Sequence, residues 1–440
     1  MLQVKLPKKI LAAAFGVLAG GLISASSFAA TDPVILTFST VGDSRQDPVA
    51  PDSTAINPAL VGVGACPVTF PITDSNGNVI QNNGLNPNPG LTGQDCKWQQ
   101  NSAAWAKIIR NIQAQKPNLL FFNGDMVMGY GKAGVPVASR ATSSSGVASE
   151  APITSPAVSD IVGSDLMQFY QQYGFWRGMV ANLIETGTYV VPVPGNHETE
   201  CKRCGKASQA VNEAAWVDNM GDLILDQARL NAVLPNNLTL NASTWNVNNY
   251  PGSADGLNTS QKQLSYSFDI GASHFVVINT DPVGNDGHAP NVWLGNDLAT
   301  AYGNGQKHIF VFGHKPAYYY AFNGSSPSST SSLNNKSASS ASTFWNLITQ
   351  YKATYFSGHE HIYNVSQPNG GASYQVIVGA GGSPFEDAAA TGTAPTDRLY
   401  SWATVTIYQS GKVVLNTYGF APTSNSPVSK LGTFTLTNTQ

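Results

Sequence analysis

Apolar runs and amphipathic segments alternate through the first two-thirds of this chain. Residues 33–40 (PVILTFST) form a compact apolar run, which predicts a buried strand. Residues 98–114 place Trp105 and Ile108 on one broad apolar face, which predicts a helix. The apolar run 118–123 predicts a second strand. A strand, a helix and a strand in this order predict a β-α-β unit.

The same alternation predicts the later elements. Further helices are expected at 165–184, 291–301 and 342–351. Further strands are expected at 189–194, 264–269, 274–279, 308–312 and 354–356. The end of the chain predicts strands alone, at 374–378, 401–408, 412–418 and 432–436. This pattern predicts an α/β fold with two packed mixed β-sheets flanked by helices, and an antiparallel β segment at the C-terminal end.

Three long segments interrupt the pattern and are interpreted as insertions in one domain of residues 30–440. Residues 47–95 are dominated by Pro, Asn, Gly and Asp, and residues 131–160 are low in complexity. Residues 199–262 form the third insertion, with a short helix expected at 212–230. Loops of this length are uncommon inside compact domains, so they are expected at the surface.

The N-terminal end has the pattern of a secretory signal. Lysines between residues 5 and 9 precede an apolar stretch at 10–23, and the small residues Ser27 and Ala29 follow at the −3 and −1 positions of a cleavage site. We expect residues 1–29 to be cleaved, so that an exported protein begins near Ala30, secreted or periplasmic and without a membrane span. An uncleaved membrane anchor is the alternative.

Composition narrows the range of partners. The chain has 440 residues, of which 42% are hydrophobic and 11% charged, and its net charge is −3. A basic surface that attracts nucleic acid is therefore not expected. The oligomeric state cannot be read from the sequence.

The four cysteines are Cys66, Cys96, Cys201 and Cys204. An even number in an exported chain favours two disulfides, with three possible pairings. Cys66–Cys96 would close a Gly/Asn/Pro-rich insertion, and Cys201–Cys204 would close a tight turn. A zinc site made from all four cysteines and a redox-active C-x-x-C are the rival interpretations.

Five short polar blocks end strand-like runs, and in each block a glycine directly precedes a carboxylate, carboxamide or imidazole. They are Gly42-Asp43-Ser44-Arg45, Gly124-Asp125, Gly195-Asn196-His197-Glu198, Gly313-His314-Lys315-Pro316 and Gly358-His359-Glu360-His361. Such side chains, gathered at one edge of a sheet, are the ligands that a pair of divalent metal ions needs.

In this order, the blocks resemble the calcineurin-like metallophosphoesterase superfamily, and within it the purple acid phosphatase-like branch. The segments 273–280 (SHFVVINT) and 308–316 (HIFVFGHKP), with Trp293, Leu294 and Leu298, support that branch. The resemblance extends over roughly residues 34 to 420. It implies a four-layer αββα sandwich and a dinuclear metal centre.

The resemblance also implies a role for each block. Two divalent or trivalent ions, Fe, Zn or Mn, would share Asp125 as a bridging ligand. Asp43 and His361 would complete the first metal site. The remaining ligands would hold the second metal, and they are Asn196, His314 and His359.

The expected chemistry is hydrolysis by a metal-bridging hydroxide, because two metal ions acidify water and neutralise phosphoryl oxygens. His197 would donate a proton to the leaving group or stabilise the transition state. Glu198 would orient His197 or a residue in the second shell around the metal ions.

The first block departs from the family pattern. Many members carry Asp-x-His where this chain has Asp43-Ser44-Arg45, and purple acid phosphatases carry a tyrosine where this chain has Met128. The first metal therefore lacks one customary ligand, so water or another group fills the gap or the ion binds weakly. Arg45 is expected either to contact substrate phosphate or to form a structural salt bridge.

The other histidines have simpler interpretations. His274 and His308 lie in apolar strands and are expected to be satisfied structural residues. His288, in a loop, is either exposed or at the rim of the site.

The sequence thus predicts an exported metal-dependent phosphoesterase that acts on small phosphate monoesters, of acid phosphatase type. A phosphodiesterase or nucleotidase is the nearest alternative. The second alternative, motivated by the incomplete first metal site, is a metal-poor binding protein on the same fold.

Overall fold

The computed structural model describes residues 32–45, 72–73, 79–81, 102–129, 131–134, 154–162, 164–201, 205–224, 226–235, 238, 246–318, 332–333, 337–383, 399–421 and 426–436. The chain divides into two units, residues 1–32 and residues 33–440, and the helices and strands below belong to the second. Among the described residues, no helix is long and apolar enough to cross a membrane.

The first sheet has six strands in the order β16-β15-β14-β1-β4-β5. Its parallel half consists of β1 (Val34–Val41), β4 (Leu119–Asn123) and β5 (Tyr189–Val193). Its antiparallel half consists of β14 (Tyr400–Tyr408), β15 (Val413–Phe420) and β16 (Ser429–Thr435). The two halves meet where β14 pairs antiparallel with β1.

The second sheet also has six strands, in the order β12-β13-β11-β10-β9-β8. Its four central strands are parallel, and they are β9 (Ser273–Val277), β10 (His308–Phe312), β11 (Thr354–Ser357) and β13 (Gln375–Val378). The two edge strands are β8 (Tyr266–Ile270) and β12 (Tyr363–Ser366), which pair antiparallel with β9 and β13.

Aromatic side chains join the two sheets face to face. Phe121 of β4 stacks on Phe312 of β10, with ring centroids 3.7 Å apart. Phe38 of β1 makes an edge contact with Phe310 of β10, at 4.9 Å between centroids. Successive residues of a strand point to opposite faces, so the outward-facing residues of these strands need a second cover.

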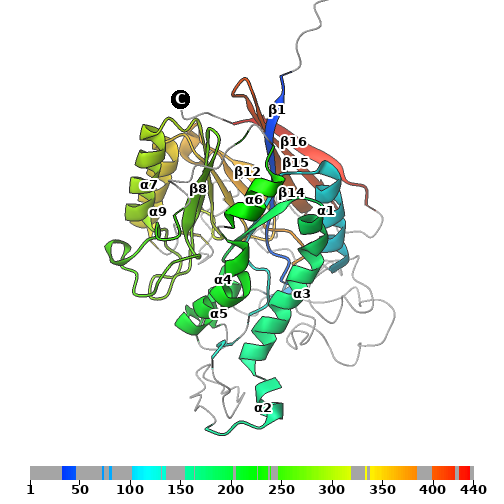
Figure 1. Cartoon of the computed structure of the whole chain (residues 1–440), viewed down its shortest axis with the longest axis vertical. Coiled ribbons are helices and arrows are strands. Elements are labelled where there is room, and N and C mark those ends of the chain that lie inside the picture. The colour runs from blue at the N-terminus through cyan, green and yellow to red at the C-terminus, as the bar shows by residue number, and fades with distance from the viewer. Residues whose placement is uncertain are drawn as a thin grey trace, which may run out of the picture. The chain divides into compact units, whose positions relative to one another are not determined.

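Helices provide that cover (Figure 1). Helices α1 (Ser102–Gln115) and α3 (Asp165–Glu185) cover the first sheet, where Phe122 packs between Trp105 and Trp176 with ring centroids 5.1 Å from each. Helices α7 (Asn291–Gly303) and α9 (Ala338–Gln350) cover the second sheet through a separate apolar cluster. The result is a four-layer αββα sandwich, which confirms the predicted fold class.

The remaining elements are short. The helices are α2 (Val158–Val162), α4 (Asn196–Thr199), α5 (Ala210–Met220) and α6 (Gln227–Val233), with single turns at Gly221–Leu223, Ser253–Asp255 and Pro368–Gly370. Two small antiparallel pairs are β2 (Ile72–Thr73) with β3 (Val79–Gln81), and β6 (Glu200–Cys201) with β7 (Ala207–Ser208).

Three predictions of secondary structure were wrong in detail. The strand expected at 374–378 was assigned to the antiparallel segment, but β13 pairs parallel with β11. The helix expected from residue 342 begins at Ala338, because the Ser337 hydroxyl accepts a hydrogen bond from the backbone of Ser340. The single helix expected at 212–230 is two helices, α5 and α6, separated by a turn at Gly221–Leu223.

Several predictions fall on residues that the structure does not describe. They are the signal segment 1–29, most of the insertion 47–95, and the pairing partners Cys66, Cys96 and Cys204. Both expected disulfides therefore stay predictions.

Candidate metal centre

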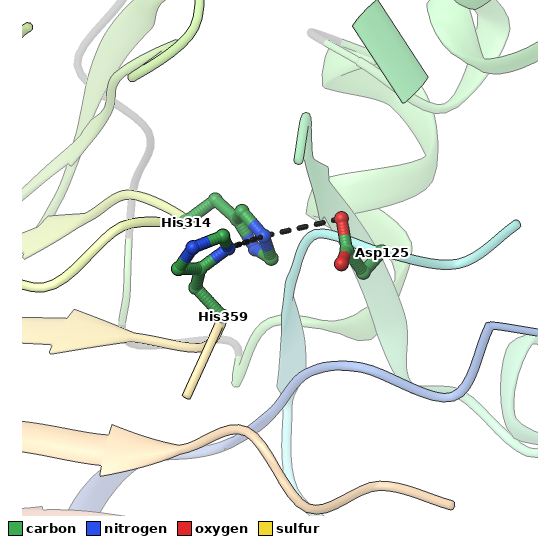
Figure 2. A group of neighbouring side chains, drawn as sticks. All are labelled: Asp125, His314 and His359. Carbon is green, nitrogen blue, oxygen red and sulfur yellow. Dashed lines mark hydrogen bonds and ion pairs between the residues drawn. The ribbon is translucent and has the colours of Figure 1, made fainter. Parts of the chain in front are cut away.

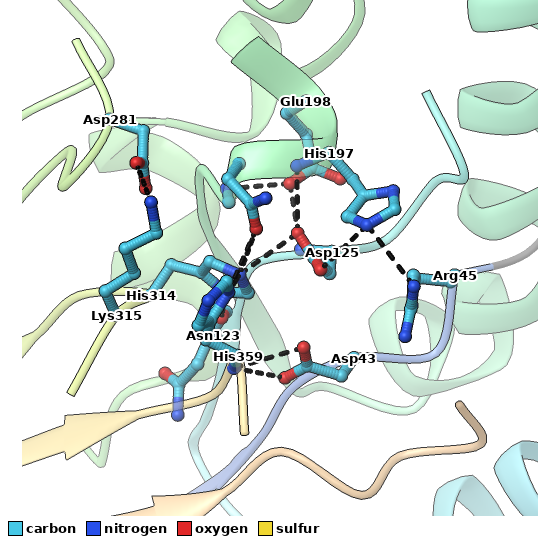
Figure 3. A network of polar contacts seen from close by, with 12 residues as sticks. Asp43, Arg45, Asn123, Asp125, His197, Glu198, Asp281, His314, Lys315 and His359 are labelled. Atoms are coloured by element: carbon cyan, nitrogen blue, oxygen red, sulfur yellow. Dashed lines mark hydrogen bonds and ion pairs between the residues drawn. The ribbon is translucent and has the colours of Figure 1, made fainter. Parts of the chain in front are cut away.

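Five parallel strands end at one place, and each of them leads into one of the polar blocks. In the first sheet these strands are β1, β4 and β5; in the second they are β10 and β11. The carboxyl ends of parallel strands lie at the same edge of a sheet, and the two sheets pack face to face. The structure therefore brings together side chains that are up to 318 residues apart in the chain, from Asp43 to His361. Figure 3 shows Asp43, Asp125, His314 and His359 gathered in this way.

Two glycines show how tightly the blocks approach one another. A Cβ atom at Gly124 would lie 2.5 Å from Nδ1 of His314. A Cβ atom at Gly358 would collide with a carboxylate oxygen of Asp43. Glycine is required at both positions because any other residue would push a candidate ligand away.

The backbone of the centre is held in an uncommon conformation. Asp43, Arg45, Asp125 and His359 have positive φ angles of 63°, 40°, 56° and 68°. Left-handed backbone is unfavourable for residues with a Cβ atom, and such strain is concentrated at functional sites. The folded sandwich thus imposes these turns in order to direct the side chains inward.

One group of donors, here called the second-metal group, consists of Asp125, Asn196, His314 and His359. Nε2 of His314 lies 3.1 Å from Oδ1 of Asp125 and 2.9 Å from Oδ1 of Asn196. Nδ1 of His359 lies 3.0 Å from both the Asn196 oxygen and the His314 nitrogen. Figure 2 shows the imidazoles of His314 and His359 directed toward the carboxylate of Asp125.

The tautomer of His314 suits a metal ligand. Its Nδ1 lies 2.7 Å from the carbonyl oxygen of Asn123, which can only accept a hydrogen bond. Nδ1 therefore carries the proton, and the lone pair of Nε2 faces the group in the neutral ring. A backbone carbonyl is a usual partner for the distal nitrogen of a metal-bound histidine.

The electrostatic field at this group favours a cation. Burial favours the neutral imidazole of His314, but the negative charges of Asp125 and Asp43 raise its pKa to about 9. Burial also opposes the ionisation of Asp125, but His197 and His314 hold its pKa well below its usual range. A bound metal ion would take the place of the proton on Nε2 of His314.

A second group, here called the first-metal group, consists of Asp43, Asp125 and His361. One ligand atom from each lies within 4.8 Å of the other two. Nε2 of His361 is 3.5 Å from Oδ1 of Asp43. Burial first, and then the neighbouring charge of Asp125, raise the pKa of Asp43 well above its usual range. The two groups share Asp125, as a dimetal site requires, and the six predicted ligands thus lie together; their role stays a prediction.

Arg45 lies beside the first-metal group, against His361. Its Nη2 is 2.9 Å from Nδ1 and 2.7 Å from Nε2 of His361. Its Nη1 is 3.3 Å from Nε2 of His197, and its Nε donates to the hydroxyl of Ser383 at 3.0 Å. In the described part of the chain it pairs with no carboxylate, so the structural salt bridge expected as one alternative is absent there.

His197 is fixed with one nitrogen toward the centre. Its Nδ1 contacts the carbonyl oxygen of Met128, so Nδ1 carries a proton. Its backbone N–H donates to Oδ1 of Asp125 at 3.0 Å, and its Nε2 lies 3.7 Å from Oδ2 of the same residue. Nε2 is therefore the atom that can exchange a proton with a substrate.

Of the two roles expected for Glu198, its hydrogen bonds do not include the ring of His197 but do include the backbone of Asp125. One of its oxygens accepts from the backbone N–H groups of Asp125 and Gly195, at 2.8 and 2.7 Å. The other accepts from Met126 and Val127, at 2.7 and 3.1 Å. Burial, followed by the charge of Asp125, raises the pKa of Glu198 to about 7. Its role is to join two ligand-bearing loops through their backbones.

A buried charge network beneath the second-metal group was missed from the sequence. Nδ2 of Asn196 donates to Glu200 at 3.2 Å, which directs the amide oxygen toward the two imidazoles. Lys315 lies 3.6 Å from Glu200 and also pairs with Asp281 (Figure 3). Two signals were available: Lys315 directly follows His314, and Asp281 follows the end of β9.

The other histidines lie outside both groups. His274 pairs with Asp269 at 2.6 Å and with Asp297 at 2.9 Å, so it is a satisfied structural residue, as expected. His308 is buried at the start of β10, and His288 is half-buried with Nδ1 3.0 Å from the Asp286 carbonyl.

Comparison with known proteins gives a family and a set of similar structures. A family model described as calcineurin-like phosphoesterase matches residues 95–363. No curated protein matches the chain. The chain is similar to a purple acid phosphatase from yellow lupin (Lupinus luteus) seeds, with 12% identity and a TM-score of 0.47, over 91% of this chain and 53% of that chain. It therefore spans about half the length of the lupin protein.

Two further solved structures are similar at low identity. A dimetal phosphatase from Danio rerio has 10% identity and a TM-score of 0.46, over 92% of this chain and 99% of that chain. GAP50, the anchor in the inner membrane complex of Plasmodium, has 11% identity and a TM-score of 0.38, over 92% of this chain and 89% of that chain.

Proposed function

The chain belongs to the calcineurin-like phosphoesterase family, and we propose that it is an exported, metal-dependent phosphatase that hydrolyses small phosphate monoesters. One observation carries this proposal: four donor side chains converge at the strand ends, those of Asp125, Asn196, His314 and His359. Two of these donors are imidazoles and two are oxygens, a mixture that suits Fe, Zn or Mn.

The donors present fit such an ion. Asn123 and Glu200 already fix the orientations of His314 and Asn196, so these ligands lose little freedom when an ion binds. When bound, the metal supplies a Lewis acid that activates water and neutralises charge on the phosphoryl group.

The residues of the chain itself supply the other parts of the reaction. Nε2 of His197 would deliver a proton to the oxygen of the departing alcohol, because Nδ1 is already committed to Met128. Arg45 would hold phosphoryl oxygens through its guanidinium, which lies at the same side of the centre as His197. Asp125 orients both histidines, through the backbone of His197 and the ring of His314.

The proposal is tested by assaying the purified protein on p-nitrophenyl phosphate and on bis(p-nitrophenyl) phosphate, before and after chelation. We expect a higher kcat/KM for the monoester, loss of activity on chelation, and recovery when metal returns. A preference for the diester would instead favour the phosphodiesterase or nucleotidase alternative. If the purified protein holds no stoichiometric metal, and Asp125→Asn leaves any measured hydrolysis unchanged, the result would favour the non-catalytic binding protein.

The proposed export rests on the sequence pattern of residues 1–29. Expression of the full chain in a bacterium, followed by N-terminal sequencing of the protein outside the cytoplasm, tests it. We expect an N-terminus near Ala30; a chain that stays in the cytoplasm with Met1 intact would contradict export.

A further inference from the structure

We propose that the guanidinium of Arg45 replaces the first metal ion, so that this centre holds one resident metal ion instead of two. The single ion would be held by the second-metal group, and Arg45 would supply the second fixed positive charge. This inference rests on the proposed function, because it specifies how the same centre binds the phosphoryl group.

The first support is the position of the guanidinium. Nη2 of Arg45 lies 2.9 and 2.7 Å from the two ring nitrogens of His361, and one of these nitrogens can accept a hydrogen bond from it when the ring is neutral. Metal–nitrogen bonds are about 2.0–2.1 Å long, so an ion on Nε2 of His361 would lie within about 5 Å of Nη2. A dication and a guanidinium at that separation repel one another, so the charges of Asp43 and Asp125 would have to offset that repulsion for the ion to bind. The imidazole that should bind the first ion is thus already paired with a cation.

The second support is that Arg45 is held in place from several sides. Its Nε donates to the hydroxyl of Ser383 at 3.0 Å. Its backbone N–H donates to the carbonyl oxygen of Asp125 at 2.8 Å, and its φ angle is 40°. Both the backbone and the side chain of Arg45 are thus constrained, so its charge has a fixed position. A surface arginine would need neither the strained backbone nor these hydrogen bonds.

The third support is the loop that carries Ser383. The backbone N–H of Ser383 donates to the carbonyl oxygen of Asp43 at 3.0 Å, and that of Gly381 donates to Gly42 at 2.9 Å. The loop after β13 is therefore hydrogen-bonded to the first block, and its Ser383 hydroxyl orients Arg45. In its described part, residues 379–383, this loop supports the arginine and carries no carboxylate or imidazole.

The fourth support is the difference in donors between the two groups. The second-metal group has four donors whose orientations are set by Asn123 and Glu200. Among the residues that the structure describes, the first-metal group has Asp43 and His361 besides the shared Asp125. Both oxygens of Asp43 also accept from the backbone N–H of His359, at 3.1 and 3.0 Å. Met128 supplies only a thioether and a carbonyl, and the carbonyl binds His197.

The replacement is chemically sufficient for phosphoryl transfer. A guanidinium presents N–H groups in a planar fork that matches two phosphoryl oxygens, and it carries charge at every relevant pH. It cannot activate water, so that task would fall to the single ion. The division of labour is therefore one ion for activating water and one arginine for binding charge.

The test is the number of metal ions per chain. Wild type, Arg45→His and Arg45→Gln are stripped, reloaded with excess Mn²⁺ or Zn²⁺, desalted, and analysed by elemental analysis and native mass spectrometry. We expect one ion per chain in wild type and two in Arg45→His, which restores the Asp-x-His pattern. Arg45→Gln removes the charge without adding a ligand, so it should bind a second ion more weakly than Arg45→His does. In the Mn²⁺ samples, electron paramagnetic resonance should show an isolated ion in wild type and a spin-coupled pair in Arg45→His.

Two results would overturn the inference. Wild type with two ions per chain shows that Arg45 does not replace the first ion. One ion in both wild type and Arg45→His shows that Arg45 is not what excludes the first ion. If Arg45→His fails to fold, the number of ions bound by wild type still tests the inference, because two ions per wild-type chain would overturn it. Two ions with metal-dependent activity would remove this inference alone, whereas no ion and full activity would remove the proposed function as well.

Discussion

Two buried clusters in this protein are built from the same residue types and do different work. The metal-centre cluster contains Asp43, Asp125, His314, His359 and His361, and the strand cluster contains Asp269, His274 and Asp297. In both, carboxylates raise the pKa of a buried histidine, His314 or His274, to about 9. Residue type and burial therefore do not separate a metal site from a structural ion pair.

The pairing of the atoms does separate them. In the strand cluster each ring nitrogen of His274 faces a carboxylate oxygen, and Gln306 and Ser267 donate to the carboxylates at 2.8 and 2.7 Å. In the metal-centre cluster three potential acceptors surround one nitrogen, Nε2 of His314. They are Oδ1 of Asp125 at 3.1 Å, Oδ1 of Asn196 at 2.9 Å and Nδ1 of His359 at 3.0 Å. Donors that meet acceptors complete a structure, whereas acceptors that converge on one another need a cation.

Exchanging His314 for glutamine should have the largest effect on the metal-centre cluster. His314→Gln removes an imidazole ligand, and we expect kcat/KM to fall by about 10³–10⁴-fold, roughly 4–5 kcal/mol. Metal content should fall in parallel. Steady-state kinetics and elemental analysis on the same preparation measure both, and a fully loaded, fully active variant would place the site elsewhere.

The matching exchange in the strand cluster should act on stability instead. His274→Gln leaves Asp269 and Asp297 buried without their shared cation, a loss of about 3 kcal/mol or more in the free energy of unfolding. Activity per folded molecule should stay near the wild-type value. Urea unfolding and kinetics below the transition check this, and the comparison of clusters fails if activity falls while stability does not.

The strand cluster also predicts a pH dependence. Burial opposes the charge on His274, but Asp297 and Asp269 raise its folded-state pKa to about 9 from an ordinary 6.5. The folded protein therefore binds the extra proton, and the full stabilisation is present below about pH 6.5. It is lost as pH rises through about 9, for a total of roughly 3 kcal/mol.

Unfolding of wild type and His274→Gln across this pH range isolates that contribution. The difference in stability between them should shrink from pH 6.5 to pH 9. A difference that is constant with pH would mean that His274 does not change its charge.

Removing the support of Asn196 should have the smallest effect. Glu200→Gln weakens the interaction that directs the Asn196 oxygen toward His314 and His359, and we expect metal affinity to fall by about 10–100-fold. Calorimetric titration of the stripped protein measures it. Glu185→Gln, at the exposed end of α3, is the matched control and should bind metal as wild type does. If Glu200→Gln binds metal as tightly as wild type, Glu200 does not position Asn196 for metal binding and has a structural role alone.

Much of this arrangement could be predicted because it is local in the sequence. An apolar run that ends in a glycine and a polar residue marks the end of a buried strand, and β10 matches its predicted bounds, 308–312. His274 was separated from the ligands for the same reason, because it lies within a strand and not after one. The position of a histidine relative to the strand end was the informative signal.

What could not be predicted depends on contacts between distant segments. Glu198 binds backbone N–H groups 71 to 73 residues away, and nothing in its own block indicates them. The parallel pairing of β13 depends on the connection that brings it beside β11. Arg45 could be identified as a departure from the family pattern, but its contact with His361, 316 residues away, needs the folded chain.

The most direct test of the account is a metal titration of the stripped wild-type protein, with phosphate-monoester hydrolysis followed at each addition. The account predicts negligible activity without metal, and activity that rises in proportion to the ion bound. It also predicts that His314→Gln stays inactive over the same range of added metal. Full hydrolysis by the stripped protein, or equal recovery in His314→Gln, would contradict the claim that this cluster is a catalytic metal centre.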